Sequence, residues 1–312
     1  RAALASATMA LASLEILIRL PETYPQGGNG AYKGTLVYNN SYMMAGPDGA
    51  YILETAASRW AWKKLETPAA ISNSYSLDTD YKRVDSGTRK AIAVVNERMA
   101  CLDESDAGRI ADKQSWKTYV EDRFMSRFSA GDARRRAVTG LINAAAEAGS
   151  RAAVMAVLRA HAAPDPEKPG RPRNVCDHDA DVMGNPTTAS MLLEYGSEGR
   201  MVLWFTGASY PCSNLYKPVL LENGHFMPLW VAYDYTEGGE GGEAYWRTRR
   251  DALAGIRRNA RKADGHAGAL AAAQATIFQI VDSVPVGVSG ADVADAAHQI
   301  GAAVAAWDAI RV

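Results

Sequence analysis

The chain has 312 residues, of which 47% are hydrophobic, and its formal net charge at pH 7 is -1. That length and composition suffice for a full hydrophobic core, and the near-neutral charge gives no reason to expect nucleic acid or an anionic membrane as partner. Three cysteines at unrelated spacings do not indicate a disulfide scaffold, so we expect a reducing, cytoplasmic compartment. The apolar stretch Ala2–Ile18 contains Ser, Thr and Glu15 and is too mixed for a membrane span.

The first half of the chain has the pattern of one helix followed by antiparallel strands. A helix is predicted over Ala3–Arg19, and Pro21 with the turn residues that follow it should end this helix. Gly46-Pro47-Asp48-Gly49 is a strong turn sequence that predicts a hairpin. The predicted strands are short apolar or β-branched runs, namely Leu36–Met44, Ala50–Glu54, Arg59–Leu65 and Ala69–Asn73.

Helices and a second group of strands follow. Helices are predicted over Val84–Arg98 and over Ala133–Ala146, the second with Ser129 and Asp132 as capping candidates. The proline-rich stretch Pro164–Pro172 is the clearest linker. The remaining expected elements are a hairpin of Ser190–Glu194 with Met201–Thr206, a strand over Tyr216–Leu221, and helices from Tyr245 onward with a break near Val284–Gly287. These blocks predict an α+β fold in a single domain, made of residues 1–163, the linker 164–172, residues 173–242 and residues 243–312.

Several segments are distinctive as motifs. In chain order they are Tyr24-Pro25-Gln26-Gly27-Gly28, Tyr38-Asn39-Asn40-Ser41-Tyr42, Ile52-Leu53-Glu54-Thr55 with Trp60, Cys176-Asp177-His178, Pro186-Thr187-Thr188-Ala189-Ser190-Met191 and Pro211-Cys212-Ser213-Asn214-Leu215-Tyr216-Lys217-Pro218. In type and order they resemble motifs of the secernin-like dipeptidases, a family of N-terminal-nucleophile hydrolases, and more distantly penicillin V acylase and bile-salt hydrolase. The resemblance implies a four-layer αββα sandwich of two antiparallel sheets, incomplete in this chain.

The resemblance also implies a reaction. Family members hydrolyse a peptide or other amide through a thioester acyl-enzyme, without metal or organic cofactor, and their mature chain begins with the nucleophilic cysteine. This chain begins with Arg1, and Cys101, Cys176 and Cys212 are internal and have no α-amino group to act as base. We therefore expect a second polypeptide, or another stretch of the same one, to supply the nucleophile and to complete the sheets beside Tyr38–Ala45 and Ala69–Asn73. The alternative is a catalytically inactive binding or structural subunit that keeps the fold.

Two residues are the catalytic candidates. Asn73 matches the position at which the family places an oxyanion-hole amide, although an asparagine there is also an ordinary turn residue. Arg134 best matches an arginine near the active-site cysteine, with Arg127, Arg135 and Arg136 as competitors. Donors to one carbonyl must converge, so we expect Asn73 and Arg134 within about 10 Å of each other, at the open end of the sandwich.

Asn40 and His178 are the substrate-binding candidates implied by the resemblance. His178 lies in Cys176-Asp177-His178-Asp179-Ala180-Asp181, which alone resembles a metal cluster, but the family resemblance favours a histidine that lines the substrate cleft. A productive contact between Cys176 and His178 is not expected, because residues two positions apart lie side by side on a strand or diverge on a helix. The spacing of His161 suggests no partner for it.

Glu54 and Trp60 are expected to anchor the sheet to a loop. A glutamate among apolar neighbours needs a buried partner, and Arg59 or a backbone amide would serve.

Overall fold

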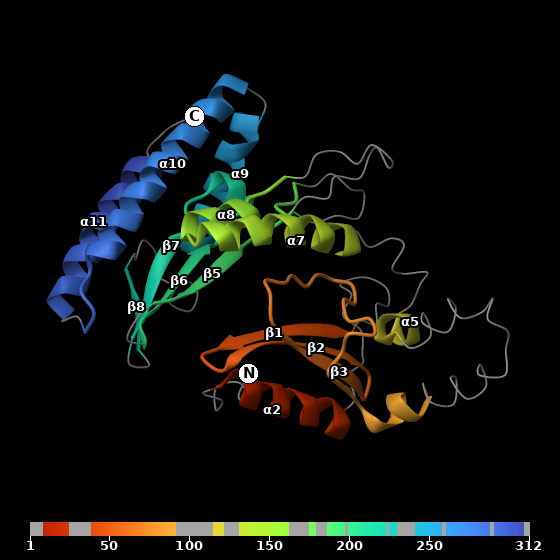
Figure 1. Cartoon of the computed structure of the whole chain (residues 1–312). Helices are drawn as coiled ribbons and strands as arrows, with labels where there is room; N and C mark the ends of the chain where they lie inside the picture. Colours follow the sequence, from red (N-terminus) through yellow and green to blue (C-terminus); the bar gives the residue numbers. More distant parts are fainter. Residues whose placement is uncertain are drawn as a thin grey trace. The chain divides into compact units, whose positions relative to one another are not determined.

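The computed structural model describes residues 9–24, 39–91, 115–121, 131–161, 175–178, 186–196, 199–222, 225–229, 241–257, 260–287 and 290–308. These residues form two four-stranded antiparallel sheets with accompanying helices, so the prediction of an α+β fold is confirmed (Figure 1). The chain separates into two compact units, residues 1–144 and residues 145–312. The predicted linker at 164–172 lies outside the described residues.

The first sheet contains the hairpin that the turn sequence predicted. Its strands are β1 (Asn40–Gly46), β2 (Gly49–Ala56), β3 (Arg59–Leu65) and β4 (Arg83–Val84), in the order β1-β2-β3-β4. Gly46 pairs with Gly49 across Pro47 and Asp48, and Gly49 has a φ of 126°, which favours glycine. Strand β3 has the predicted bounds.

The strand predicted over Ala69–Asn73 is wrong. The open edge of β3 is occupied instead by β4, with Ala61 opposite Val84 and Trp62 opposite Arg83. Because β4 takes the backbone hydrogen bonds of that edge, residues 69–73 run outside the named strands.

The two faces of this sheet carry different cores. Helix α2 (Ala10–Thr23) packs Leu14 against Tyr51, Leu53 and Trp60 on one face. The alternate residues Ile52, Ala61 and Val84 face the other way, as the two-residue period of a strand requires, and pack with Tyr75, Leu77 and Trp116. The β2 and β3 strands are therefore covered on both sides within this unit.

Helix α2 does not end where the sequence predicted. Pro21 lies inside the helix, which continues to Thr23. The helix is anchored at both ends: Asp48 accepts hydrogen bonds from the N–H groups of Ala10 (2.9 Å) and Leu11 (2.8 Å), and Trp60 Nε1 donates to Glu22 Oε1 (2.8 Å). The hydrogen bond from Trp60 to Glu22 ties down the last turn, in which Pro21 cannot donate a backbone hydrogen bond.

The described residues of this unit include three further helices, wholly or in part. The helix predicted at Val84–Arg98 is observed over 86–91, and residues 92–98 lie outside the described residues. Helix α5 (Trp116–Val120) is a single short turn. Helix α7 (Gly131–Ala148) contains the predicted Ala133–Ala146 and crosses the boundary between the two units.

The second sheet also matches the sequence prediction. It comprises β5 (Ser190–Tyr195), β6 (Met201–Thr206), β7 (Lys217–Glu222) and β8 (His225–Pro228), in the order β5-β6-β7-β8, so the predicted hairpin and the strand after it are confirmed. The described helices that lie wholly in this unit are α8 (Arg151–Leu158), α9 (Gly241–Arg257), α10 (Ala260–Ser283) and α11 (Gly290–Asp308), with the predicted break between the last two.

Described helices cover one face of this second sheet. Trp204 and Leu220 pack with Ile277 of α10 and Ile300 of α11 in the largest core of the molecule, and Figure 1 shows α10 and α11 side by side. On the opposite face, large apolar side chains remain exposed: Met191 (66%), Leu193 (41%), Tyr195 (51%) and Phe226 (68%). Among the described helices, none has the length and apolar character needed to cross a membrane.

Candidate functional site

In the first unit, the segment 73–77 is held by a buried carboxylate. Glu54 on β2 is fully buried and accepts hydrogen bonds from Ser76 N (2.6 Å), Ser76 Oγ (2.7 Å) and Leu77 N (3.2 Å). Burial raises the pKa of Glu54, against the opposing effect of these donors and of the Arg135 charge. The expected anchor is thus confirmed, with backbone amides as its partners, whereas Arg59 pairs with Asp85 (3.0 Å).

A second carboxylate holds the same segment from the other side. Asp132, in the first turn of α7, accepts a hydrogen bond from Ser74 Oγ (3.2 Å), forms a close ion pair with Lys117, and lies 3.5 Å from Arg135 Nη2. Burial works to raise the pKa of Asp132, but the Lys117 and Ser74 hydrogen bonds and the Arg135 charge outweigh it and lower the pKa. The start of α7 is therefore fixed against the residue that follows Asn73.

Asn73 and Arg134 meet directly. Arg134 Nη2 donates to Asn73 Oδ1 at 2.7 Å, and Ser72 Oγ lies 3.2 Å from the same oxygen. The predicted proximity is confirmed, and Arg134 is the arginine that makes this contact; Arg135 faces Asp132 instead. Both donors bind Oδ1, so the two contacts fix the orientation of the Asn73 side-chain amide.

The two other arginines that competed for this position are placed differently. Arg136 is exposed on α7, and Arg127 lies outside the described residues. Asn73 is itself exposed and Arg134 is half-buried, so the pair is accessible from solvent.

Asn40, the first substrate-binding candidate, begins β1 opposite Thr55. Its carbonyl accepts a hydrogen bond from Thr55 Oγ1 (3.2 Å), while the Thr55 carbonyl accepts one from Tyr75 Oη (2.9 Å). Asn40 is thus tied through its backbone to the end of β2, next to Glu54. A role for its side chain in substrate binding stays a prediction.

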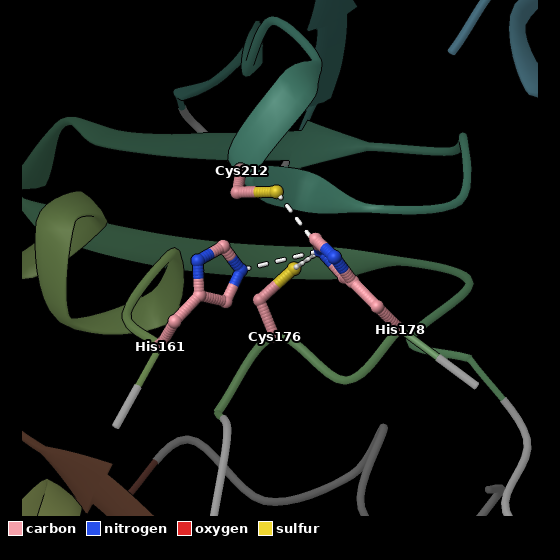
Figure 2. A group of neighbouring side chains, drawn as sticks. All are labelled: His161, Cys176, His178 and Cys212. Atoms are coloured by element: carbon pink, nitrogen blue, oxygen red, sulfur yellow. Dashed lines mark hydrogen bonds between the residues drawn. The ribbon is translucent and has the colours of Figure 1, made fainter. Parts of the chain in front are cut away.

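In the second unit, His178 belongs to a cluster of four side chains. Figure 2 shows His161, Cys176, His178 and Cys212 pointing toward one another, and their ligand-type atoms all lie within 4.8 Å of one another. The Nε2 atom of His178 is 3.2 Å from His161 Nε2, 3.4 Å from Cys176 Sγ and 3.1 Å from Cys212 Sγ. The expectation that Cys176 and His178 do not make contact is wrong. The expectation that His161 has no partner is also wrong, because His161 contacts His178.

Backbone hydrogen bonds bring the distant parts of this cluster together. The carbonyl of Ala160, just past α8, accepts from the N–H groups of Val175 and Cys176 (3.2 Å each). Thr187 continues the connection, because its Oγ1 accepts from Asp177 N (2.9 Å) and its carbonyl accepts from Tyr210 N (2.9 Å). The irregular segment 175–178 is therefore positioned by the helix on one side and by the strand-flanking residues on the other, which places Cys176 beside His178.

Cys212 is presented by the short 3-10 helix η3 (Pro211–Ser213). Tyr210 precedes it with a φ of 64°, a left-handed conformation that is uncommon for a tyrosine and that turns the chain toward the cluster. Arg159 fixes the turn, since its Nε donates to the Pro211 carbonyl (3.0 Å) and its Nη2 to the Asn214 carbonyl (2.8 Å).

The two thiols of the cluster have unlike environments. Hydrogen bonds from Cys176, His178 and Ser213 lower the pKa of the Cys212 thiol. The pKa of the Cys176 thiol is raised, because this thiol is hydrogen-bonded to Cys212 and is buried. Cys176 is completely buried, and Arg159 carries a positive charge close to both sulfurs. The environment therefore favours negative charge on the sulfur of Cys212 and disfavours it on that of Cys176. The nitrogen and sulfur atoms of the four side chains are of the types that bind metal ions.

Sequence reasoning missed this cluster because its parts are far apart in the chain. The family resemblance implied no metal, and Cys176-Asp177-His178 alone offers too few ligands for one. His161 and Cys212 complete the set from positions 17 residues before and 34 residues after His178, a spacing that matches no common metal motif. No protein-family model and no solved structure matches the chain.

Proposed function

We propose that the chain is part of a secernin-like cysteine amidohydrolase, a dipeptidase-type enzyme that hydrolyses a peptide or another amide. The observation that carries the proposal is the 2.7 Å hydrogen bond between Arg134 and Asn73, two residues 61 positions apart that the motif resemblance had paired. Chance would seldom bring one chosen amide and one of several neighbouring arginines into contact.

The chemistry of the pair suits the hydrolysis of an amide. Attack on the carbonyl carbon places negative charge on its oxygen, and donors fixed in advance stabilise that charge at no cost in reorganisation. Arg134 polarises the Asn73 amide by binding its oxygen, which strengthens the amide N–H groups as donors. Glu54 and Asp132 hold the flanking residues 74–77, so that Asn73 is positioned before substrate arrives.

The nucleophile in this proposal is an N-terminal cysteine on a segment outside these 312 residues. Its α-amino group, with an ordinary pKa of about 7.7 to 8.0, accepts the thiol proton, and the thiolate attacks the amide carbonyl. The C–N bond then breaks, the leaving amine takes the proton, and a thioester remains. Water hydrolyses the thioester and restores the thiol, so the reaction needs no cofactor.

The same proposal includes the four-layer αββα sandwich and a cytoplasmic setting. The exposed apolar face of strands β5 and β8, opposite the face that the helices cover, is the kind of surface that a second sheet buries in a sandwich. The two cysteines in the described part of the chain are free thiols, which suits a reducing compartment.

The test uses an active form that contains the N-terminal cysteine. We expect Asn73→Ala to lower kcat by about 100- to 1000-fold, which is the range for loss of one oxyanion donor. Arg134→Ala should lower kcat in the same direction, whereas Arg136→Ala, at an exposed position two residues further along α7, is the matched control and should leave kcat unchanged. Unaltered turnover in Asn73→Ala would remove this residue from the mechanism. A complete protein without any amidase activity would favour the inactive binding or structural subunit.

A further inference from the structure

We propose that His161, Cys176, His178 and Cys212 form a closed binding site for one zinc ion. The four side chains come from three segments: the residues after α8, the segment 175–178, and η3. Each contributes a nitrogen or sulfur atom, and Figure 2 shows the other three side chains gathered around His178. This proposal does not depend on the amidase proposal, because the four residues do not include the catalytic candidates Asn73 and Arg134, and it gives His178 a metal-binding role in place of the expected role in the substrate cleft.

The distances fit tetrahedral zinc. With Zn–N of about 2.05 Å and Zn–S of about 2.3 Å, tetrahedral geometry places two nitrogens about 3.3 Å apart and a nitrogen and a sulfur about 3.5 Å apart. The observed separations are 3.2 Å between the two imidazole nitrogens, and 3.4 Å and 3.1 Å from His178 Nε2 to the sulfurs of Cys176 and Cys212. The three separations that involve His178 Nε2 are therefore close to the tetrahedral values, and the remaining separations in the cluster are no longer than 4.8 Å.

Hydrogen bonding alone does not account for this arrangement. The Nε2 atom of a neutral imidazole has either one proton to donate or one lone pair to accept with. His178 Nε2 nevertheless has three nitrogen or sulfur neighbours within 3.4 Å. A cation at the centre would satisfy all four electron-pair donors together, which pairwise sharing of protons cannot do.

The charges favour zinc among the common divalent metals. Two thiols lose their protons to solvent on binding, so two thiolates, two neutral imidazoles and one Zn²⁺ form a neutral unit that can be buried beside Cys176. Thiolate and imidazole ligands in a tetrahedral set are typical of zinc, whereas Mg²⁺ and Ca²⁺ prefer oxygen. Four protein ligands leave no open position, so the ion is structural and joins the three segments.

The first experiment measures the metal itself. The 312-residue chain, purified under reducing conditions from zinc-supplemented medium, should contain one zinc per chain by elemental mass spectrometry. After the zinc is removed with a chelator, titration with Co²⁺ should produce the ligand-field bands of tetrahedral cobalt and a sulfur-to-cobalt charge-transfer band, which Zn²⁺ then abolishes. A metal-free protein with no cobalt bands, or a Cys176–Cys212 disulfide found by mass spectrometry in the reduced preparation, would overturn the proposal.

Variants then identify the ligands. Cys212→Ser and His178→Ala should each lose the zinc and the tetrahedral cobalt spectrum. Cys101→Ser and His298→Ala, which change the remaining cysteine and an exposed histidine of α11, are the matched controls and should keep one zinc per chain. Equal loss of zinc from the controls would contradict the assignment.

A stability measurement gives a separate readout. Chelation should lower the Tm of the wild-type chain by on the order of 10 °C, because binding to the folded state alone stabilises it. The Tm of Cys212→Ser should not respond to the chelator. A wild-type Tm that is unaffected by zinc removal would rule out the structural role.

Discussion

At the scale of single residues, Glu54 is a fully buried carboxylate that depends on its hydrogen-bond donors. Both of its carboxylate oxygens accept hydrogen bonds, from Ser76 on one side and from the Leu77 N–H on the other. Glu54→Gln keeps the shape of the side chain but replaces one carboxylate oxygen with an NH2 group. That NH2 group would face the N–H donor of Ser76 or of Leu77, so buried donors would lack an acceptor. We expect a loss of about 1 to 3 kcal/mol in the free energy of unfolding.

Urea unfolding of the Glu54→Gln variant measures this loss. Glu66→Gln makes the same chemical change at an exposed position and should cost nothing measurable. If both variants unfold at the same urea concentration as the wild type, the Glu54 contacts do not anchor the segment that carries Asn73.

Contacts that follow from the neighbouring residues in the sequence could be predicted, whereas contacts that depend on the tertiary structure could not. The need of Glu54 for a buried partner follows from its apolar neighbours, so it could be stated in advance. The contact between Cys212 and His178 could not, because it depends on the left-handed Tyr210 and on the hydrogen bonds of Arg159, which no spacing encodes.

At the scale of secondary-structure elements, Asp85 connects β3 to the helix that follows β4. Its carboxylate accepts from Arg59 Nη1 (3.0 Å), Trp60 N (3.3 Å) and Thr88 N (2.9 Å), the last as an N-terminal helix cap. Burial works to raise the pKa of Asp85, but the hydrogen bonds of Thr88, Arg59 and Trp60 outweigh it and lower the pKa.

This lowered pKa predicts a pH dependence. A carboxyl group with a lowered folded-state pKa adds stability above its unfolded pKa of about 3.9, and that stability is lost as the pH falls through the folded value. The Asp85→Asn variant still has a residue that can cap the helix, but its side-chain amide does not titrate. Urea unfolding between pH 7 and pH 3 should therefore show a steeper loss of stability below about pH 4 for the wild type than for Asp85→Asn. Parallel curves would show that the charge of Asp85 contributes nothing.

The elements that the sequence predicted correctly are those that local chemistry determines. Gly46-Pro47-Asp48-Gly49 specifies a tight turn, and the hairpin around it has the expected pairing. The strand expected at Ala69–Asn73 failed because a later segment, β4, competes for the same edge of β3. Helix α2 passes Pro21 because contacts to Asp48 and Trp60 hold its two ends, and both partners belong to other elements.

At the scale of the whole molecule, the exposed apolar side chains on one face of the second sheet should promote association of the chain. Met191 and Phe226 are each about two thirds exposed, and exposed apolar patches of this kind promote association. The double variant Met191→Lys with Phe226→Lys should stay monomeric at several-fold higher concentration than the wild-type 312-residue chain, as measured by light scattering.

The same double variant tests what covers this face. In the active form that carries the proposed N-terminal cysteine segment, the two lysines should weaken the assembly if a second layer buries them. Leu11→Lys, an exposed apolar position on α2, is the control for a general effect of added charge. A double variant that aggregates like the wild type would show that this face is not the source of association.

In the proposed reaction, Asn73 and Arg134 serve a cysteine nucleophile that lies outside these 312 residues. The structure contains an internal competitor, since Cys212 Sγ lies 3.1 Å from His178 Nε2. The most direct test compares dipeptide hydrolysis by the 312-residue chain alone with hydrolysis by the form that carries the N-terminal cysteine. We predict turnover only in the second form, and its loss when that cysteine is changed to alanine. Hydrolysis by the chain alone that disappears in Cys212→Ser and persists in Asn73→Ala would contradict the account and assign the chemistry to the second unit.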